Sequence, residues 1–261
     1  MTVSRARLIA TLSAPFLAMG AYLLFAVLGW WPVAVMSMMG LSFVTYGSTS
    51  HDLVHRTLRL PPRLNDTLLS LIELLSLRSG TAYRLSHLHH HRRLLADDDL
   101  EGAAAHGTFW QALASGPPMQ CRLWRWAWRT HPALRLRLAW EGAGILLLIA
   151  AAIFAVRWSA IPIVYVGLAV AGSWVFPVVT AYIPHDGRGD SALTRTRLFR
   201  GRLVQWIALH HLYHLEHHLY PAVPHHHWQT LARRLDARFL ALGLLPQALE
   251  TQSRKSEGDG R

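Results

Sequence analysis

The chain has 261 residues, of which 52% are hydrophobic and only 16% charged, and its formal net charge at pH 7 is +11. A soluble domain carries about 25% charged residues, so this composition argues against a soluble protein. The 11 tryptophans favour a membrane protein with interfacial anchors. The single cysteine excludes an intrachain disulfide and a cysteine-based metal site.

Four apolar stretches predict transmembrane helices, because about 20 residues at ~1.5 Å each cross the ~30 Å hydrocarbon core. These stretches are residues 8–29, 33–50, 139–156 and 160–183. A shorter apolar stretch at 66–77 predicts a helix at the membrane surface. We expect an all-α integral membrane protein with a single domain over residues 1–248 and a disordered polar tail over 249–261.

The positions of the positive charges predict the orientation of these spans. With four spans both termini lie on one side, and 25 of the 26 lysine and arginine residues fall on that side. The positive-inside rule identifies it as cytoplasmic. We therefore expect a protein of a bacterial inner membrane with a cytoplasmic active site and cytoplasmic termini. Because no nucleic-acid-binding motif accompanies the charge, we expect no nucleic-acid partner.

All 17 histidines lie on the predicted cytoplasmic side, and many of them occur in regular patterns. HDLVH has two histidines at i, i+4, and HLHHH and HLEHH each have three at i, i+3, i+4, which places them on one face of a helix. His210 lies one turn before the last motif, and His185 follows the fourth predicted span. The candidate metal ligands are His51, His55, His87, His90, His91, His185, His210, His214, His217 and His218.

Neutral imidazole is the commonest protein ligand for iron, zinc, copper and nickel. Ten candidates exceed the needs of one tetrahedral zinc, so the sequence predicts two metal ions, and the absence of cysteine ligands favours iron. We expect a cytoplasmic cap of helices to hold this site. Asp52, Asp186 and Glu216 are the candidates to accept the second ring N–H of a ligand and fix its tautomer. The run at 97–99 either caps backbone N–H groups or is a solvated loop.

The three motifs resemble the histidine boxes of the membrane fatty acid desaturase superfamily, which includes the carotenoid ketolases and hydroxylases. YIPHDG and HHLYHLEHHLYPAVP are similar to the ketolase branch, whereas HDLVHRTLRLPPRLND and LADDDLEG depart from it. The resemblance implies a non-haem centre of two Fe that uses O₂ as co-substrate to attack a C–H bond of a membrane lipid. It also implies a separate electron donor, a ferredoxin or a cytochrome.

A fatty acyl chain is the first choice of substrate and a carotenoid (β-ionone) ring the second, while the oligomeric state stays open. Two other classes of protein fit the sequence less well. A histidine-rich metal transporter predicts ionisable residues within the spans, and only Glu141 lies in one. A membrane zinc hydrolase predicts the motif H-E-x-x-H, which does not occur.

Overall fold

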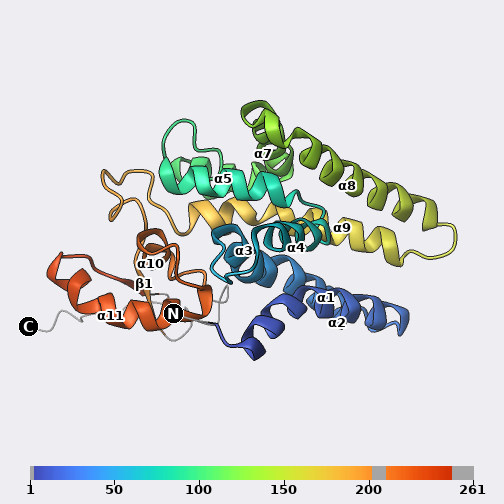
Figure 1. Ribbon diagram of the computed structural model, residues 1–261, viewed down its shortest axis with the longest axis horizontal. Helices are drawn as coiled ribbons and strands as arrows, with labels where there is room; N and C mark the ends of the chain where they lie inside the picture. The colour runs from blue at the N-terminus through green and yellow to red at the C-terminus, as the bar shows by residue number, and fades with distance from the viewer. Residues whose placement is uncertain (1–2, 202–209, 249–261) are drawn as a thin grey trace, which may run out of the picture.

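The computed structural model describes residues 3–201 and 210–248, and in these ranges the chain is mainly helical (Figure 1). Two long helical hairpins project to one side, and the C-terminal helix lies at the opposite end. Short helices that carry the histidine motifs lie between them. The predicted tail at 249–261 lies outside the described residues.

The two hairpins are built in the same way, and each ends in a π-helix before the histidine region. The first consists of α1 (Arg5–Val27), α2 (Trp31–Met39), the π-helix η1 (Gly40–Ser50) and α3 (His51–His55). The second consists of α8 (Arg135–Ala155), α9 (Ile161–Trp174) and the π-helix η4 (Val178–Tyr182). π-Helical turns are rare and often occur at functional sites. Here η1 leads from its hairpin into the first histidine motif, and η4 leads from the other hairpin toward His185.

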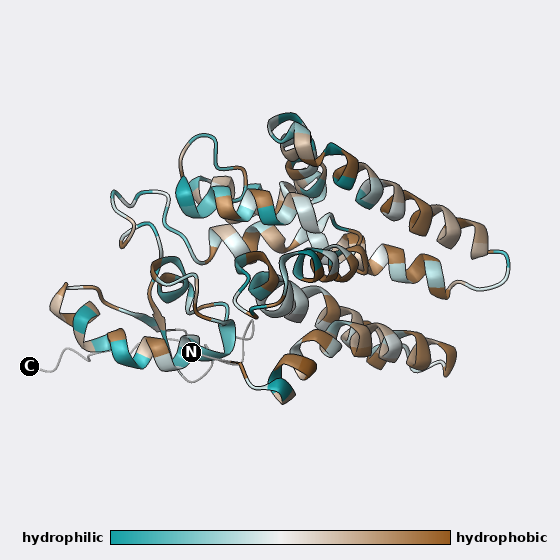
Figure 2. Ribbon diagram, viewed as in Figure 1, coloured by the Kyte–Doolittle hydropathy of each residue, from teal (hydrophilic) through white to brown (hydrophobic). Residues whose placement is uncertain are grey.

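Three helical segments are long and apolar enough to cross a membrane: Arg5–Val27, Pro132–Ala155 and Ile161–Tyr182. Hydrophobic residues dominate both hairpins (Figure 2). The predicted span at 33–50 is divided between α2 and the π-helix η1, so neither helix reaches the required length alone. The structure thus supports an integral membrane protein and does not confirm the predicted number of four spans.

The helices between the hairpins place the second histidine motif. They are α4 (Pro62–Leu74), α5 (Gly80–Arg92), η2 (Gly102–His106), α6 (Phe109–Ala114), α7 (Gly116–Thr130) and η3 (Pro132–Leu134). The side chain of Glu141 in α8 accepts hydrogen bonds from the hydroxyl of Ser79 and from the backbone N–H of Thr81, 3.2 Å away. A carboxylate is stabilised at a helix N-terminus, so Glu141 fixes the start of α5.

A buried ion pair lies beneath the histidine region. Nε of Arg78 donates to Oε2 of Glu73 at 2.6 Å, and both side chains are at most 1% exposed. The guanidinium also lies over the rings of Tyr46 and Phe176, at 5.2 and 4.5 Å from their centroids. A buried charge is tolerated when it is paired, and this pair joins α4 to the ring cluster around η1 and η4.

The C-terminal part covers the histidine region from the side away from the hairpins (Figure 1). Its elements are β1 (Phe199–Arg200), α10 (His214–Leu219), η5 (His225–His227), α11 (Trp228–Ala241) and β2 (Gln247–Ala248). β1 and β2 pair in parallel. Helix α10 ends at Leu219, as expected from the proline that follows Tyr220.

Candidate metal centre

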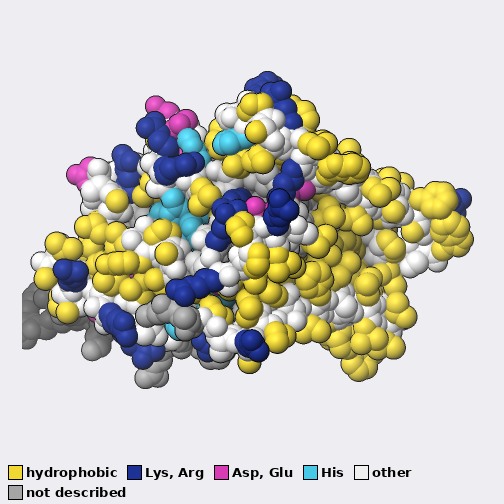
Figure 3. All heavy atoms as spheres, in the orientation of Figure 1, with side chains coloured by type: hydrophobic (Ala, Val, Ile, Leu, Met, Phe, Trp, Pro, Cys, Tyr) yellow, Lys and Arg dark blue, Asp and Glu magenta, His cyan; other side chains and the backbone are white. Residues whose placement is uncertain are grey.

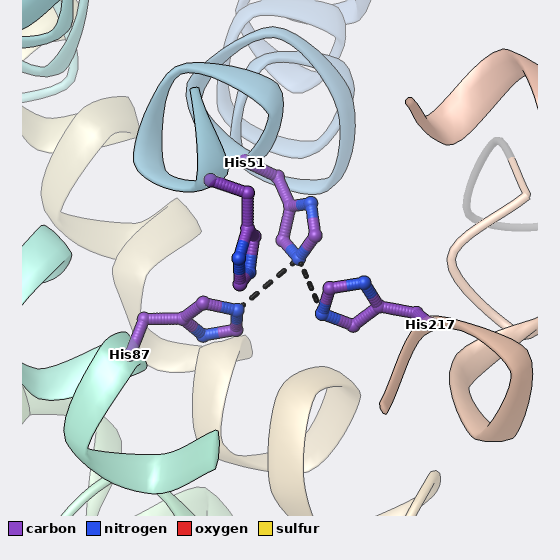
Figure 4. A group of neighbouring side chains, drawn as sticks. His51, His87 and His217 are labelled. Atoms are coloured by element: carbon purple, nitrogen blue, oxygen red, sulfur yellow. Dashed lines mark hydrogen bonds between the residues drawn. The ribbon is translucent and has the colours of Figure 1, made fainter. Parts of the chain in front are cut away.

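The first cluster of histidines forms where α3, α5 and α10 meet (Figure 4). Nε2 of His51 lies 3.1 Å from Nε2 of His87 and 3.0 Å from Nε2 of His217. Nε2 of His91 lies 3.2 Å from that of His87 and 2.8 Å from that of His217, which closes a ring of four nitrogens. A fifth ring, that of His55, has its centroid 4.8 Å from that of His51. We call this set the first histidine group.

The second histidine group contains His90, His185, His214 and His218. Nε2 of His185 lies 3.2 Å from Nε2 of both His214 and His218, and these two nitrogens are 3.1 Å apart. The ring centroid of His90 lies 4.8 Å from that of His185. Because His185 follows the π-helix η4 and His90 belongs to α5, this group ties the second hairpin to α5 and α10.

The two groups are direct neighbours. The rings of His91 and His218 are stacked, with centroids 4.4 Å apart and an interplanar angle of 27°. The adjacent residues His90 and His91 belong to different groups, and so do His217 and His218. Each of the two H-x-x-H-H motifs therefore contributes rings to both groups.

Two buried carboxylates orient one ring in each group. Glu101 accepts a hydrogen bond from Nδ1 of His87, and Asp99 accepts one from Nδ1 of His90, both at 2.7 Å. A ring that donates Nδ1–H to a carboxylate directs the lone pair of Nε2 into the group, which is the usual arrangement behind a metal-bound histidine. Burial alone raises the pKa of both carboxyl groups, but hydrogen bonding and charge from their histidine partners outweigh it and lower the pKa.

The sequence did not assign these two carboxylates to the site. Asp99 also accepts the backbone N–H groups of Leu95 and Gly102, as one of the two interpretations of the acidic run expected. Its contact with His90 and the role of Glu101 were missed. The signal that could have revealed them is an acidic segment, LADDDLEG, directly after the second histidine motif.

Burial keeps most of these rings neutral. Desolvation, followed by the charges of neighbouring histidines, lowers the pKa of His51 and His217 well below 6.5. Desolvation, followed by the charges of His87 and Arg84, lowers the pKa of His55 to about 2. His90 differs, because hydrogen bonding and charge from Asp99 outweigh desolvation and raise its pKa. Neutral imidazoles are the protonation state that binds metals.

The donor set fits a pair of metal ions. The ring tautomer held by Glu101 leaves a lone pair on Nε2 of His87, which points at the buried Nε2 of His51 and at the partly buried Nε2 of His91. Converging lone pairs in a dry site repel one another unless a cation lies between them. Nine imidazoles in two groups, without sulfur ligands, suit iron, zinc, copper or nickel rather than magnesium or calcium.

The three acidic residues expected to orient ligands have other partners among the described residues. Asp52 accepts from the backbone N–H and Nδ1 of His225, at 3.0 and 2.7 Å. Asp186 pairs with the exposed Arg188, and Glu216 pairs with Arg200 at 2.5 Å. Asp52 directly follows His51, and Glu216 directly precedes His217. Adjacent residues on an α-helix point about 100° apart, so each of these acids points away from its neighbouring histidine. None of these bonds is to a histidine of either group, and a role for the three acids in orienting ligands stays a prediction.

Of the ten candidate ligands, His210 is the one that the structure does not bring to either group. The sequence predicted that His210 extends the helix of the third motif by a turn. Instead φ of His210 is +70°, a left-handed conformation that ends a helix, and α10 begins only at His214. Its neighbour His211 is buried beside the second group, with its ring centroid 4.9 Å from that of His214. That the other nine bind metal stays a prediction.

A third, smaller cluster lies beside the first histidine group. It consists of Asp52, His225 and His226. The hydrogen bonds from His225 to Asp52 attach η5 to α3, and Trp228 follows directly. Trp228 is fully buried, and its ring centroid lies 5.1 Å from that of His51 and 5.0 Å from that of His217. The start of α11 thus closes one side of the first group.

The comparison with known protein families agrees with this geometry. The sequence model described as fatty acid desaturase matches residues 28–247, which include every histidine of both groups. A search of curated proteins found no match. The two adjacent histidine groups and the three helices that are long and apolar enough to cross a membrane are consistent with this match, and a match over this much of the chain shows that the chain belongs to the fatty acid desaturase family.

Proposed function

We propose that this protein is an O₂-dependent oxidoreductase that uses two non-haem iron ions to act on a C–H bond of a membrane lipid. The observation that supports it most directly is the pair of adjacent histidine groups, each with Nε2 atoms converging within 3.2 Å. One metal ion cannot use nine imidazoles, whereas two ions can share them. The match to the fatty acid desaturase family supports iron and O₂ over the other metals that imidazole binds.

A fatty acyl chain is the proposed substrate, and desaturation is the proposed reaction. Removal of two hydrogen atoms from neighbouring CH₂ groups forms a C=C bond and supplies two electrons and two protons. Reduction of O₂ to two molecules of water needs four of each. A separate electron donor, a ferredoxin or cytochrome, therefore supplies the other two electrons, and solvent supplies the protons.

The protein's own residues hold and shield this chemistry. Glu101 and Asp99 fix the rings of His87 and His90, and burial excludes water from most of the site. A cavity of about 350 Å³ reaches the edges of His91 and His218 and has both apolar and arginine side chains in its wall. An amphiphilic wall suits a lipid with an apolar chain and a polar head, so this cavity is the proposed route to the centre.

Metal and product analysis together test the proposal. Protein purified in detergent should contain about two iron ions per chain, and expression in a host should add a double bond to its acyl lipids in an O₂-dependent way. His90→Ala and His217→Ala should abolish the product, whereas His131→Ala, outside both groups, should retain it. Zinc alone at full occupancy, or normal turnover in His217→Ala, would contradict the proposal.

A carotenoid ring is the second candidate substrate. YIPHDG and HHLYHLEHHLYPAVP are similar to the corresponding segments of carotenoid ketolases. The chemistry starts from the same C–H bond cleavage but ends in a hydroxyl or keto group. Expression with and without β-carotene distinguishes the two, because an oxygenated ring appears only with β-carotene and a new acyl double bond appears in either host.

A further inference from the structure

The surface of α11 carries an arginine face with no described acidic partner of its own. The helix buries Trp228, Leu231, Leu235 and Phe239 against the rest of the protein. Its exposed side presents arginines, and none of them forms a salt bridge with a described residue. These residues are Arg233, Arg234 and Arg238. The one acid among them, Asp236, is paired with Arg200 at 2.7 Å.

The position of this face argues against lipid headgroups as its main partner. Helix α11 lies at the end of the molecule opposite the tips of the apolar hairpins (Figure 1). Arginine side chains are spread over the half of the molecule that includes this end, whereas the hairpin end is largely apolar (Figure 3). A basic face directed away from the membrane-spanning segments fits an acidic protein better than a bilayer.

The same helix reaches the first histidine group through one aromatic ring. Trp228, the first residue of α11, contacts the rings of His51 and His217. The preceding turn η5 is only partly buried, and its His225 lies 6.4 Å from Trp228, centroid to centroid. Trp228 thus links the segment formed by η5 and α11 to two histidines of the first group. Because electron transfer slows steeply with distance, the ring contacts of Trp228 with two group histidines make it a suitable relay.

The cavity that reaches His91 and His218 is a poorer place for an acidic partner. One of the three arginines that line it, Arg93, pairs with Asp98 at 3.2 Å, and the acid Asp190 also lines the cavity. The charge around this opening is mixed, whereas the exposed side of α11 carries three arginines and a single acid, Asp236, which shares Arg200 with the buried Glu216. The two surfaces therefore suit different partners.

We propose that η5 and α11 form the docking surface for an acidic electron-donor protein, and that Trp228 carries its electrons to the first histidine group. The inference rests on the proposed function, because it names the partner of the same centre. Each electron would leave the reduced donor and reach the iron that the first histidine group would hold, with no net change at Trp228. Two such transfers supply the two electrons that one turnover requires.

Stopped-flow mixing tests the docking surface. The iron-loaded protein in neutral-lipid nanodiscs is mixed without O₂ with a reduced, acidic [2Fe–2S] ferredoxin. Substitution of Arg233, Arg234 and Arg238 by Gln should lower the second-order reduction rate about tenfold or more at low ionic strength and flatten its dependence on salt. A matched control removes the same charge from α7 by replacing its exposed arginines with Gln. These are Arg122, Arg125 and Arg129.

Both variants are also measured at 0.1 M salt, where long-range attraction is screened beyond ~10 Å, and there the control should leave the rate within about twofold. Equal rates in the α11 variant and the wild type would overturn the proposal. So would an effect of the α11 variant that appears only in anionic phosphatidylglycerol nanodiscs, since that result identifies a lipid-binding helix.

Trp228→Leu should lower the limiting first-order rate at saturating ferredoxin more than Trp228→Phe, while iron content is retained. Equal limiting rates would exclude the tryptophan path.

Binding of oxidised ferredoxin, measured without turnover, separates this inference from the proposed function. Binding that depends on the α11 arginines supports the docking surface even if the protein contains no iron or forms no lipid product. Conversely, the protein could form a lipid product while ferredoxin binds the α11 variant as tightly as the wild type. That result would uphold the proposed function and refute the docking surface.

Discussion

Substitution of Glu101 by Gln is the most direct test of how the first histidine group is held. Glu101 is 3% exposed and accepts from Nδ1 of His87 at 2.7 Å and from the hydroxyl of Tyr46 at 3.4 Å. Loss of a group that orients a metal-bound histidine lowers metal affinity about 10–100-fold, or about 1.4–2.7 kcal/mol. Gln keeps an oxygen that can accept from both partners and loses only the charge. We therefore expect a reduction of about tenfold.

Replacement by Ala should reach the upper end of that range. It leaves Nδ1 of His87 buried without an acceptor and frees that ring to adopt the other tautomer. The assay is competition for metal against a chelator, followed as the number of ions retained per chain. Only the ion of the first group should weaken, because the second group has its own carboxylate, Asp99.

Asp98→Asn is the control, since Asp98 is 51% exposed and pairs with the exposed Arg93. Its metal affinity should stay within about twofold of the wild type, as expected for an exposed ion pair worth at most ~1 kcal/mol. If Glu101→Gln and Glu101→Ala both bind two ions as tightly as the wild type, the carboxylate does not support a ligand. The assignment of His87 as a ligand would then fail with it.

Two further predictions concern stability. The pKa of His55 is lowered to about 2 by burial, so between pH 6.5 and 2 the unfolded chain binds a proton at this residue that the folded chain does not. The metal-free protein should therefore lose stability as pH falls below ~6.5, by up to ~1.4 kcal/mol per pH unit for each ring whose pKa is lowered. His90 has a raised pKa, so its contribution to the free energy of unfolding changes in the opposite direction. Thermal melting of chelator-treated protein from pH 7.5 to 5 checks this, and a constant Tm would contradict it. Gly80→Ala should destabilise the fold by about 1–3 kcal/mol, because a Cβ there would lie 2.8 Å from the backbone of Leu69. Gly20→Ala, which meets nothing within 4 Å, is the matched control, and an equal Tm for both variants would show that α4 and α5 do not touch as closely as the structure indicates.

The sequence predicted which histidines come together better than it predicted which carboxylates hydrogen-bond to their rings. Spacing alone identifies His51 and His55 as neighbours on one face, because helical geometry is local and periodic. The contact between Asp99 and His90 depends instead on how the chain turns after α5, which no periodicity encodes. His210 was misplaced for a related reason, since its positive φ is set by the loop that precedes α10 and not by the motif. The membrane spans were predicted from composition, but the π-helix at 40–50 was not, because its hydrophobic pattern does not differ from that of an α-helix.

The geometry of H-x-x-H-H explains how one short motif can serve two metal ions. An α-helix turns about 100° per residue, so histidines at i and i+4 are offset by ~40° and face the same point. The histidine at i+3 lies ~60° to the other side of the first. In α5 the pair His87 and His91 faces the first histidine group, and His90 faces the second.

The third motif uses the same spacing with the two groups exchanged. In α10 the pair His214 and His218 faces the second group, and His217 faces the first. The two helices therefore approach the pair of groups from opposite sides, each giving two rings to the nearer group and one to the farther. His51 and His55 complete the first group and His185 completes the second, which gives five rings and four. This division places nine of the 17 histidines in the two groups, and the proposed pair of ions needs no carboxylate ligand.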